Sequence, residues 1–229
     1  MATTLTIEGV ESGVRVIRRR GAQRVTLSVS RATGIATMTV PPRMPMAEAT
    51  RFAHSHREWL QDKLGAMPRT IPFEEGMALP YRGRMMGVTR RDGRGVRMIG
   101  ETIEVGGSAE ALPGALERWL KGQARIRLRA RSDIHAQTLD TRFTRIAIRD
   151  TRSRWGSCSS SGTLSYSWRV ILAPDPVLDY LAAHEVSHLR EMNHSARFWA
   201  HVKALCPDYQ EWQGWLRENG PELHRYGRR

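Results

Sequence analysis

His-Glu-Val-Ser-His-Leu-Arg-Glu-Met-Asn-His, at residues 184–194, is the segment of this 229-residue chain that says most about its fold and chemistry. A helix turns about 100° per residue, so His184 and His188 would project from one face, one turn apart. Two imidazoles placed in this way can bind one metal ion, and zinc accepts neutral imidazole nitrogens in a tetrahedral arrangement. The spacing therefore predicts a helix that carries two metal ligands.

A third histidine follows the predicted helix. His194 lies six residues after His188, beyond Asn193, a residue type that tolerates the left-handed turn at which many helices end. The chain can therefore return toward the two helical histidines, and Ser195 is placed to cap the next helix. We expect His184, His188 and His194 to bind one Zn²⁺ per chain and to leave a fourth position for water.

Glu185 is the candidate catalytic residue. Its neighbours on the helical wheel are apolar: Leu178, Leu181, Ala182 and Leu189. A carboxylate on such a face is costly to remove from water unless it faces a water molecule bound to the metal ion. It can then take a proton from this water and later protonate the leaving group. The pattern predicts a zinc-dependent hydrolase, most simply a metallopeptidase that cleaves peptide bonds through a metal-bound water activated by Glu185.

A closed structural zinc site is the alternative explanation of these histidines. Such a site takes a fourth protein ligand, usually cysteine, and has no use for Glu185. The chain has two cysteines, Cys158 and Cys206, which are far apart and lack the Cys-x-x-Cys spacing of thiolate zinc sites. The catalytic interpretation is therefore preferred, and no disulfide framework is expected.

The chain is strongly basic, with a formal net charge of +13 that comes from arginine, since Lys63, Lys121 and Lys203 are the only lysines. Of the 36 Lys and Arg residues, 26 lie in residues 1–150. The electrostatic field of so many positive charges attracts polyanions. An arginine-rich surface that is only solvated explains the same number of basic residues. We expect a peptide or nucleotide substrate and leave open both the oligomeric state and a polyanion partner for the arginine-rich N-terminal region.

The N-terminal sequence lacks a basic segment followed by an apolar run, and no apolar stretch is long enough to cross a bilayer. We therefore expect no membrane partner. Together with the absence of a disulfide framework, this favours a cytoplasmic location.

Hydrophobic periodicity divides the chain into elements. Short alternating runs at 14–17, 25–29 and 35–40 predict a β-meander, and residues 46–64 follow with helical spacing. No internal repeat is expected, and residues 152–162 read as a loop. Further strands are expected at 84–90, 95–99, 102–105, 144–149 and 163–172, and further helices at 114–138, 175–192, 195–205 and 207–218.

Several blocks of residues resemble a known family. They are Ser153-Arg-Trp-Gly-Ser-Cys158, Trp168-Arg169, Asp179-Tyr180, His184-Glu-Val-Ser-His-Leu189, Asn193-His-Ser195 and Phe198-Trp199. In this order they are similar to the YgjP-like metallopeptidase-domain family, relatives of the zincin-fold proteases. The resemblance implies an α+β fold with a zincin-like metallopeptidase core and an N-terminal β-rich region. It also implies three histidine ligands and a glutamate base at the positions already reached by spacing.

The resemblance also shapes the expected domains and the alternative functions. We expect an N-terminal β-rich region with one helix at residues 1–112 and a helical, zincin-like metal-binding region at 113–229, together one YgjP-like domain over about residues 15–226. A metal-dependent nucleoside triphosphate (UTP) pyrophosphatase activity, also attributed to the family, is the main alternative to peptide cleavage. A second alternative is a nucleic-acid-associated metalloprotease or binding module, in which the basic helix 114–138 docks on phosphates.

The candidate substrate-binding residues are Arg154, Trp155, Tyr166, Trp168 and Arg169. The strand expected at 163–172 precedes the predicted metal helix, and in zincin-like proteins such a strand borders the cleft and pairs with an extended substrate. Arg154 and Arg169 suit a carboxylate or phosphate, which arginine binds through two parallel hydrogen bonds. Aromatic core packing and surface ion pairing are the alternative roles of these side chains.

Overall fold

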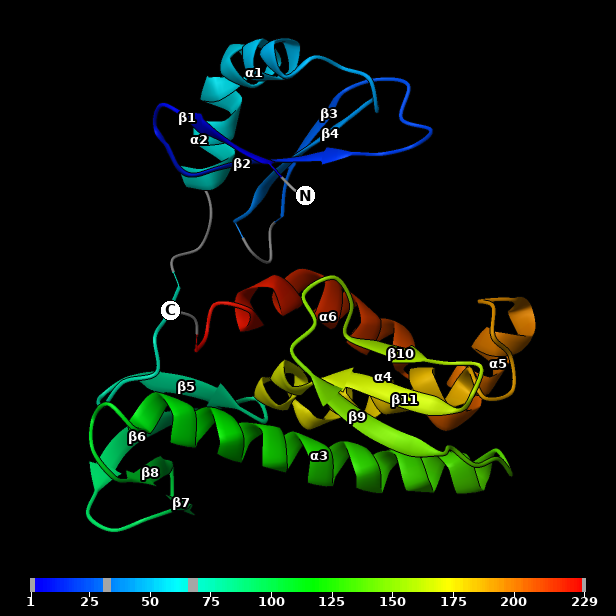
Figure 1. The fold of residues 1–229 in the computed structure, drawn as a ribbon. Helices are drawn as coiled ribbons and strands as arrows, with labels where there is room; N and C mark the ends of the chain where they lie inside the picture. Colours follow the sequence, from blue (N-terminus) through cyan, green and yellow to red (C-terminus); the bar gives the residue numbers. More distant parts are fainter. Residues whose placement is uncertain (1–2, 31–33, 66–69, 228–229) are drawn as a thin grey trace. The chain divides into compact units, whose positions relative to one another are not determined.

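The chain divides into two compact units, Met1–Arg69 and Thr70–Arg229 (Figure 1). The computed structural model describes residues 3–30, 34–65 and 70–227. The division differs from the expected boundary at 112/113, because the strands between residues 70 and 112 share one buried cluster with the helices that follow. The expected α+β fold class is confirmed, since both units combine sheets with helices.

The first unit is a four-stranded sheet followed by two helices. Its elements are β1 (Thr3–Ile7), β2 (Val10–Arg18), β3 (Thr26–Val29), β4 (Ala36–Val40), α1 (Met46–Ser55) and α2 (Arg57–Gly65). The strand order is β1-β2-β4-β3 with β2 and β4 parallel, so the expected meander is wrong. Alternate residues of β4, namely Ala36, Met38 and Val40, enter a separate core. The helix expected at 46–64 is interrupted at His56.

The second unit begins with a sheet of the same design. β5 (Ala78–Tyr81), β6 (Arg84–Arg91), β7 (Val96–Ile99) and β8 (Thr102–Gly106) have the order β5-β6-β8-β7, with β6 and β8 parallel. In both units the helical segment that follows carries a Trp-Leu pair with a fully buried leucine, Trp59-Leu60 and Trp119-Leu120. The chain thus contains a structural repeat that was not expected, because the copies share strand pairing more than sequence.

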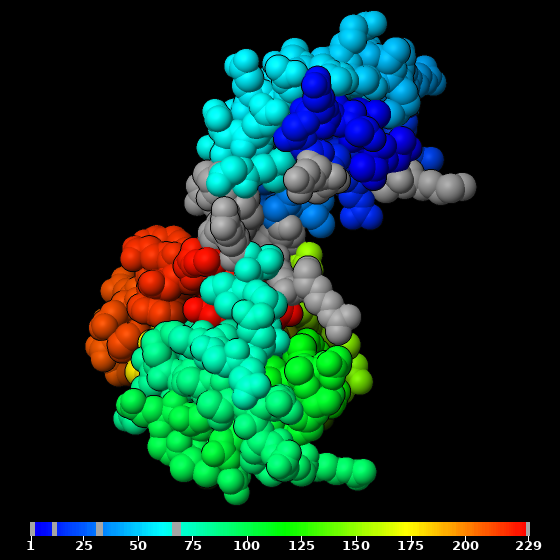
Figure 2. All heavy atoms as spheres, turned by 90° about the vertical axis from the view of Figure 1, so that its left-hand side faces the viewer, coloured from blue at the N-terminus to red at the C-terminus, as the bar shows by residue number. Residues whose placement is uncertain are grey.

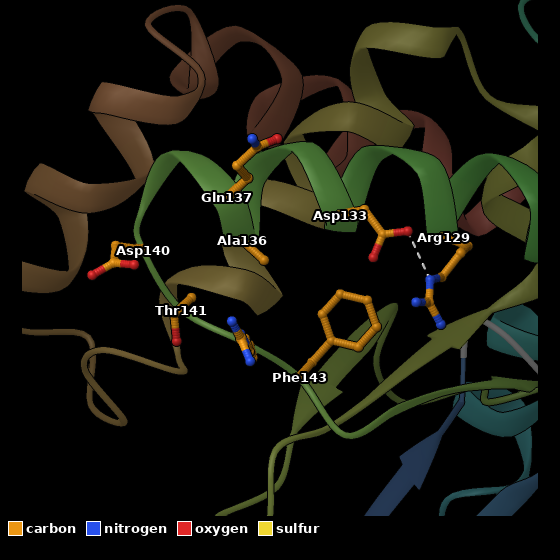
Figure 3. A pocket seen from close by; sticks show the side chains of 8 residues that line it. Arg129, Asp133, Ala136, Gln137, Asp140, Thr141 and Phe143 are labelled. Atoms are coloured by element: carbon orange, nitrogen blue, oxygen red, sulfur yellow. Dashed lines mark hydrogen bonds and ion pairs between the residues drawn. The ribbon is translucent and has the colours of Figure 1, made fainter.

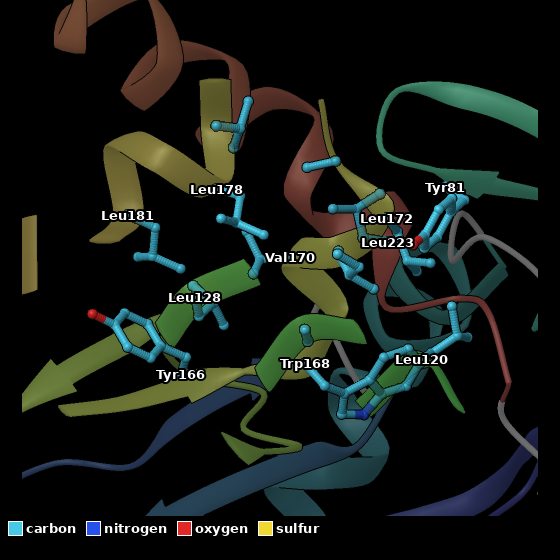
Figure 4. Packing of buried hydrophobic residues seen from close by; sticks show 14 of the residues in the cluster. Tyr81, Leu120, Leu128, Tyr166, Trp168, Val170, Leu172, Leu178, Leu181 and Leu223 are labelled. Carbon is cyan, nitrogen blue, oxygen red and sulfur yellow. The ribbon is translucent and has the colours of Figure 1, made fainter. Parts of the chain in front are cut away.

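The long helix α3 (Leu112–Thr138) supports the rest of the second unit. Its buried positions recur every three or four residues: Leu112, Leu116, Leu120, Ala124, Leu128, Ser132, His135 and Ala136. The first part of α3 packs on the β5–β8 sheet, and Figure 2 shows their teal and green atoms as one continuous body. Figure 4 shows Leu120 and Leu128 in one cluster with Tyr166 and Trp168. None of the described helices, α3 included, has the length and apolar character needed to cross a membrane.

The remaining elements form a small sheet and three further helices. They are β9 (Arg145–Arg149), β10 (Gly156–Cys158), β11 (Thr163–Ser167), the 3-10 helix η1 (Trp168–Leu172), α4 (Asp175–Ser187), α5 (Ala196–Leu205) and α6 (Tyr209–Leu223). The strand order is β10-β11-β9. The expected strand 163–172 is half strand and half 3-10 helix, and every side chain of η1 is buried rather than every second one. The expected loop 152–162 contains the edge strand β10.

The start of α4 is anchored by the turn between β5 and β6. Arg82 and Gly83 both have positive φ, which is the conformation of a two-residue hairpin turn that matches the strand twist. For Arg82 this backbone is strained, and the strain persists because its amide donates to the Ile171 carbonyl at 2.9 Å. Its side chain donates from Nε to the Asp175 carboxylate at 2.8 Å. The turn therefore holds the first residue of α4 in place.

The middle of α4 is held by α3, and the segment after α4 is held by the turn that follows α3. Asp179 Oδ1 lies 2.6 Å from Nε2 of the buried His135 and 2.5 Å from Nε of Arg131. Burial alone would raise the pKa of Asp179, but these two hydrogen bonds and the charge of Arg131 outweigh it, and the pKa is lowered. Beyond the helix, Arg190 Nε donates to the Leu139 carbonyl at 2.9 Å. Rotation and sliding of α4 are therefore both opposed.

Arg169 joins η1 to distant parts of the unit. Its guanidinium lies over the Trp168 ring at 4.4 Å, and the residue is 2% exposed. Nε and Nη2 donate to the Asp150 carboxylate at 2.7 and 3.2 Å, and Nη1 donates to the carbonyls of Leu223 and Tyr226. Burial alone would raise the pKa of Asp150, but the hydrogen bonds and charge of Arg169 lower it overall.

We predict that Asp150→Asn lowers the free energy of unfolding at pH 7 by about 2 kcal/mol, because the buried guanidinium loses its counter-charge. This is less than for a fully buried pair, since the Asp150 side chain is 37% exposed. The folded-state pKa of Asp150 lies below 3.8, so its stabilisation is complete above that pH and is lost as the pH falls through the folded-state value. Urea unfolding from pH 7 to pH 2 measures the difference.

The matched control is Asp140→Asn, since Asp140 is fully exposed and lies 3.8 Å from Arg190. It should change the stability little at any pH. Equal losses in the two variants, or a loss for Asp150→Asn that does not shrink as the pH falls below 3.8, would contradict the prediction.

Candidate metal centre

The last turn of α4 carries three of the predicted site residues. His184 and Glu185 are helical, and His188 is the C-cap residue that directly follows the helix. The ring centroids of His184 and His188 are 5.1 Å apart, as expected for side chains one turn apart on one face. The helix ends at Ser187 instead of extending to residue 192. The early end leaves the following residues free to turn back.

His194 returns toward α4 just before α5 begins. Ser195 accepts a hydrogen bond from the Phe198 amide at 3.3 Å, which confirms the predicted cap of α5. The Ser195 amide donates to the Asn193 carbonyl at 2.8 Å. Asn193 does not have the expected left-handed backbone, so the chain returns toward α4 without a left-handed residue at this position.

The three histidines converge. One nitrogen from each of His184, His188 and His194 lies within 4.8 Å of the others, and Nε2 of His184 is 3.2 Å from Nε2 of His194. Two nitrogens bound at about 2.0–2.1 Å to one tetrahedral ion are roughly 3.3 Å apart. The spacing and the all-imidazole donor set therefore fit one divalent ion of the zinc type.

Phe198 lies against all three imidazoles. Its ring centroid is 4.9 Å from His184, 4.4 Å from His188 and 4.7 Å from His194, and the side chain is fully buried. Trp199 stacks on the His194 ring at 5.8 Å. The first turn of α5 thus restricts the rings to one arrangement.

Burial favours the neutral, metal-binding form of His184 and His188. Burial, and then the neighbouring His188 and His194, lower the pKa of His184 to about 3. Burial also lowers the pKa of His188. Nδ1–H of His188 donates to the Glu191 carbonyl at 3.1 Å, so the Nε2 lone pair is free for a ligand. Neutral imidazoles with a free lone pair are the form that coordinates a cation.

Glu185 is buried beside this cluster. It is 3% exposed, and its Oε2 has no hydrogen-bond partner among the described residues. Burial raises the pKa of its carboxyl to about 8, and the positive charge of Arg154 partly offsets the rise. An unpaired buried carboxyl is costly, and a cation bound by the histidines would compensate for it.

The edge strand β10 covers Glu185, and its role was missed in the sequence. Side chains two residues apart share a face of a strand, so Gly156 and Cys158 belong to one face of β10. The Gly156 backbone touches the Glu185 side chain, and the carboxylate of Glu185, after burial, helps raise the pKa of the Cys158 thiol to about 11. A three-residue edge strand is too short to give a clear alternating pattern in the sequence.

Three of the candidate substrate-binding residues lie in the core instead of the site. Tyr166 and Trp168 are 1% and 0% exposed, and the Tyr166 hydroxyl lies 3.0 Å from the Ser132 hydroxyl. Arg169 forms an ion pair with Asp150. These three residues were chosen by type and position, which do not distinguish a buried aromatic or a buried ion pair from a ligand contact.

The other two candidates, Arg154 and Trp155, lie just before β10. Arg154 is exposed, and its charge reaches the Glu185 carboxyl. Trp155 is half-buried, with its ring centroid 4.8 Å from that of His224, and it packs against Gly220 of α6. Arg154 is therefore the candidate that remains available to a substrate, and its neighbour Trp155 is packed against α6.

A separate surface pocket lies beside the C-terminal half of α3 (Figure 3). Its volume is about 420 Å³, and its lining includes Arg129, Asp133, Arg142 and Phe143. Arg129 is paired with Asp133 at 2.7 Å and lies over the Phe143 ring at 4.9 Å. None of the lining residues belongs to the histidine cluster, so this pocket is not part of the metal centre.

Comparison with known proteins gives a family match over most of the chain. The profile of the family described as YgjP-like, metallopeptidase domain, matches residues 23–219. Among solved structures, the chain is similar to the metallopeptidase zymogen of Pyrococcus abyssi abylysin, with 21% sequence identity, 43% of this chain and 97% of that chain covered, and a TM-score of 0.38. No curated protein matches.

The family match spans most of the chain and includes Glu185 and all three histidines. This chain therefore belongs to the YgjP-like metallopeptidase domain family and is a metal-dependent hydrolase.

Proposed function

We propose that the chain is a zinc-dependent metallopeptidase in which His184, His188 and His194 hold the ion and Glu185 is the general base. The observation that carries the proposal is the convergence of three imidazoles beside a buried carboxyl with an unpaired oxygen. A structural zinc site would have no use for this carboxyl. A hydrolytic site needs it next to the reacting water.

A bound zinc ion supplies a Lewis acid that polarises water and the substrate carbonyl. The residues of the chain provide proton transfer and orient the metal ligands. Glu185 accepts a proton from the attacking water through its unpaired oxygen and delivers a proton to the leaving amine. The hydrogen bond from His188 to the Glu191 carbonyl fixes the orientation of that ring.

The sheet suggests how a peptide would lie beside these residues. β11 was expected to pair with the substrate, but both of its edges are occupied, by β10 and β9. β10 has one edge that pairs with no described strand, and it covers Glu185. An extended peptide can add to such an edge through main-chain hydrogen bonds. Arg154, just before β10, would then meet a carboxylate of the peptide.

Glu185→Gln should keep one zinc per chain and lower kcat by about 10²–10⁴-fold, because the amide accepts no proton. His188→Ala should lose both zinc and activity, because two imidazoles remain where three are needed. Metal analysis and peptide hydrolysis measured on the same samples test both variants. Full activity in the Glu185→Gln protein would contradict the assignment of the base.

Zinc-loaded protein should cut a mixed peptide library and leave UTP intact. UTP is the informative competitor, because a nucleotide pyrophosphatase could use the same ion and the same base. Mass spectrometry of the peptides and an assay for pyrophosphate read out the two reactions. Rapid pyrophosphate release without any peptide cleavage would replace the peptidase proposal.

A polyanion partner would use the exposed arginines of α3, among them Arg118, Arg125 and Arg127. Binding of DNA or RNA through these residues should weaken steeply with salt. Fluorescence anisotropy with a labelled oligonucleotide at low and high salt shows whether the chain binds such a polyanion. It leaves the peptidase assignment unchanged.

Arg154→Ala should raise KM about tenfold for peptides with a carboxylate near the cleaved bond, since one charge-assisted hydrogen bond is lost. Peptides with a neutral group at that position should be cleaved as by the wild type. Arg149→Ala on β9 is the control, because Arg149 is also exposed but lies on the opposite edge of the sheet. Equal effects on acidic and neutral peptides would contradict a recognition role for Arg154.

A further inference from the structure

We propose that Gly156 is a positioning residue for Glu185: the absence of a side chain at Gly156 creates the space in which the Glu185 carboxylate is held beside the histidine cluster. The inference rests on the proposed function of Glu185 as the base. It assigns a role to a residue that contributes no ligand, charge or hydrogen-bonding side chain of its own.

The space at Gly156 is filled by Glu185. A Cβ added to Gly156 would lie 2.7 Å from both Cγ and Cδ of Glu185 and closer still to Oε1. Side chains in folded proteins do not approach so closely, so either the added methyl or the carboxylate would have to move. The backbone at 156 is held in the β10–β11 ladder, where Gly156 pairs with Tyr166. The part that can move is therefore the Glu185 side chain.

The backbone conformation gives no other reason for glycine. Gly156 is not among the glycines with positive φ, and it lies in a strand, where alanine is normally tolerated. Glycine inside a strand otherwise weakens it through its flexibility and often marks a close approach. Here the close approach is to the candidate base.

The unpaired oxygen of the carboxylate is held by packing and not by a hydrogen bond. Oε2 of Glu185 has no hydrogen-bond partner among the described residues, and Arg154 acts on the carboxyl through charge. Tyr166, which pairs with Gly156 across the ladder, is fully buried and bonded to Ser132. The close contact with β10 is therefore one of the contacts that limit the positions open to the carboxylate.

Gly156→Ala tests the proposal directly. The fold and the three histidines stay, so the variant should bind one zinc per chain with a melting temperature within a few degrees of the wild type. Displacement of the base should lower kcat about 100-fold or more and leave KM within about twofold. Gly214→Ala on α6 is the control, because nothing lies within 4 Å of the added methyl, and it should behave as the wild type.

A double variant separates positioning from a general defect. In the Glu185→Gln background, adding Gly156→Ala should cause no further loss of the residual rate, because the group it acts through is already inactive. A further loss equal to that seen in the wild type would overturn the proposal. So would a Gly156→Ala enzyme with wild-type kcat.

A crystal structure of metal-free Gly156→Ala gives a readout that does not depend on activity. The Glu185 carboxylate should be displaced by about 1 Å or more, with the histidine rings in place. An unmoved carboxylate would overturn the proposal, even if the wild type cut no peptide and the proposed function itself failed. If Gly156→Ala does not fold, Glu185→Ala should restore folding by vacating the space, and an unfolded double variant would count against the proposal.

Discussion

A carboxyl buried without a hydrogen-bond partner costs several kcal/mol unless a cation compensates for it, and Glu185 is in that position. The rest of the second unit can be understood as the means of keeping this group beside three imidazoles. The desolvated carboxyl and the clustered imidazoles are each unfavourable arrangements of polar groups in the metal-free chain. One divalent ion makes both favourable, since it needs neutral nitrogens and a nearby base.

The histidines converge only if α4 is held at a defined rotation and height. The strained turn at Arg82 fixes its start, the contact of Asp179 with His135 fixes its middle, and α3 carries both the sheet and the helix. The strand β10 covers Glu185 with Gly156, which has no side chain. A rigid helix with ligands on one face and a close-fitting strand above it is a precise way to place reacting groups.

The chemistry of the site could be read from the sequence because it is local. Helical periodicity alone places His184, Glu185 and His188, and a short turn limits where His194 can go. The parallel pairing of β2 with β4, the strand β10 and the pair of His135 with Asp179 depend on contacts between distant residues, which periodicity does not encode. Arg169 illustrates the same limit of sequence-based prediction. An arginine suits a substrate carboxylate, and only the fold reveals that the guanidinium of Arg169 is already bound to the Asp150 carboxylate.

The most direct measurement is X-ray absorption spectroscopy of the zinc-loaded protein with one ion per chain. We predict three imidazole nitrogens and one oxygen at about 2.0–2.1 Å, with no sulfur. A zinc–sulfur distance of about 2.3 Å, or fewer than three imidazole ligands, would show that the ion is held elsewhere or by other residues, and would contradict the assignment of the metal centre.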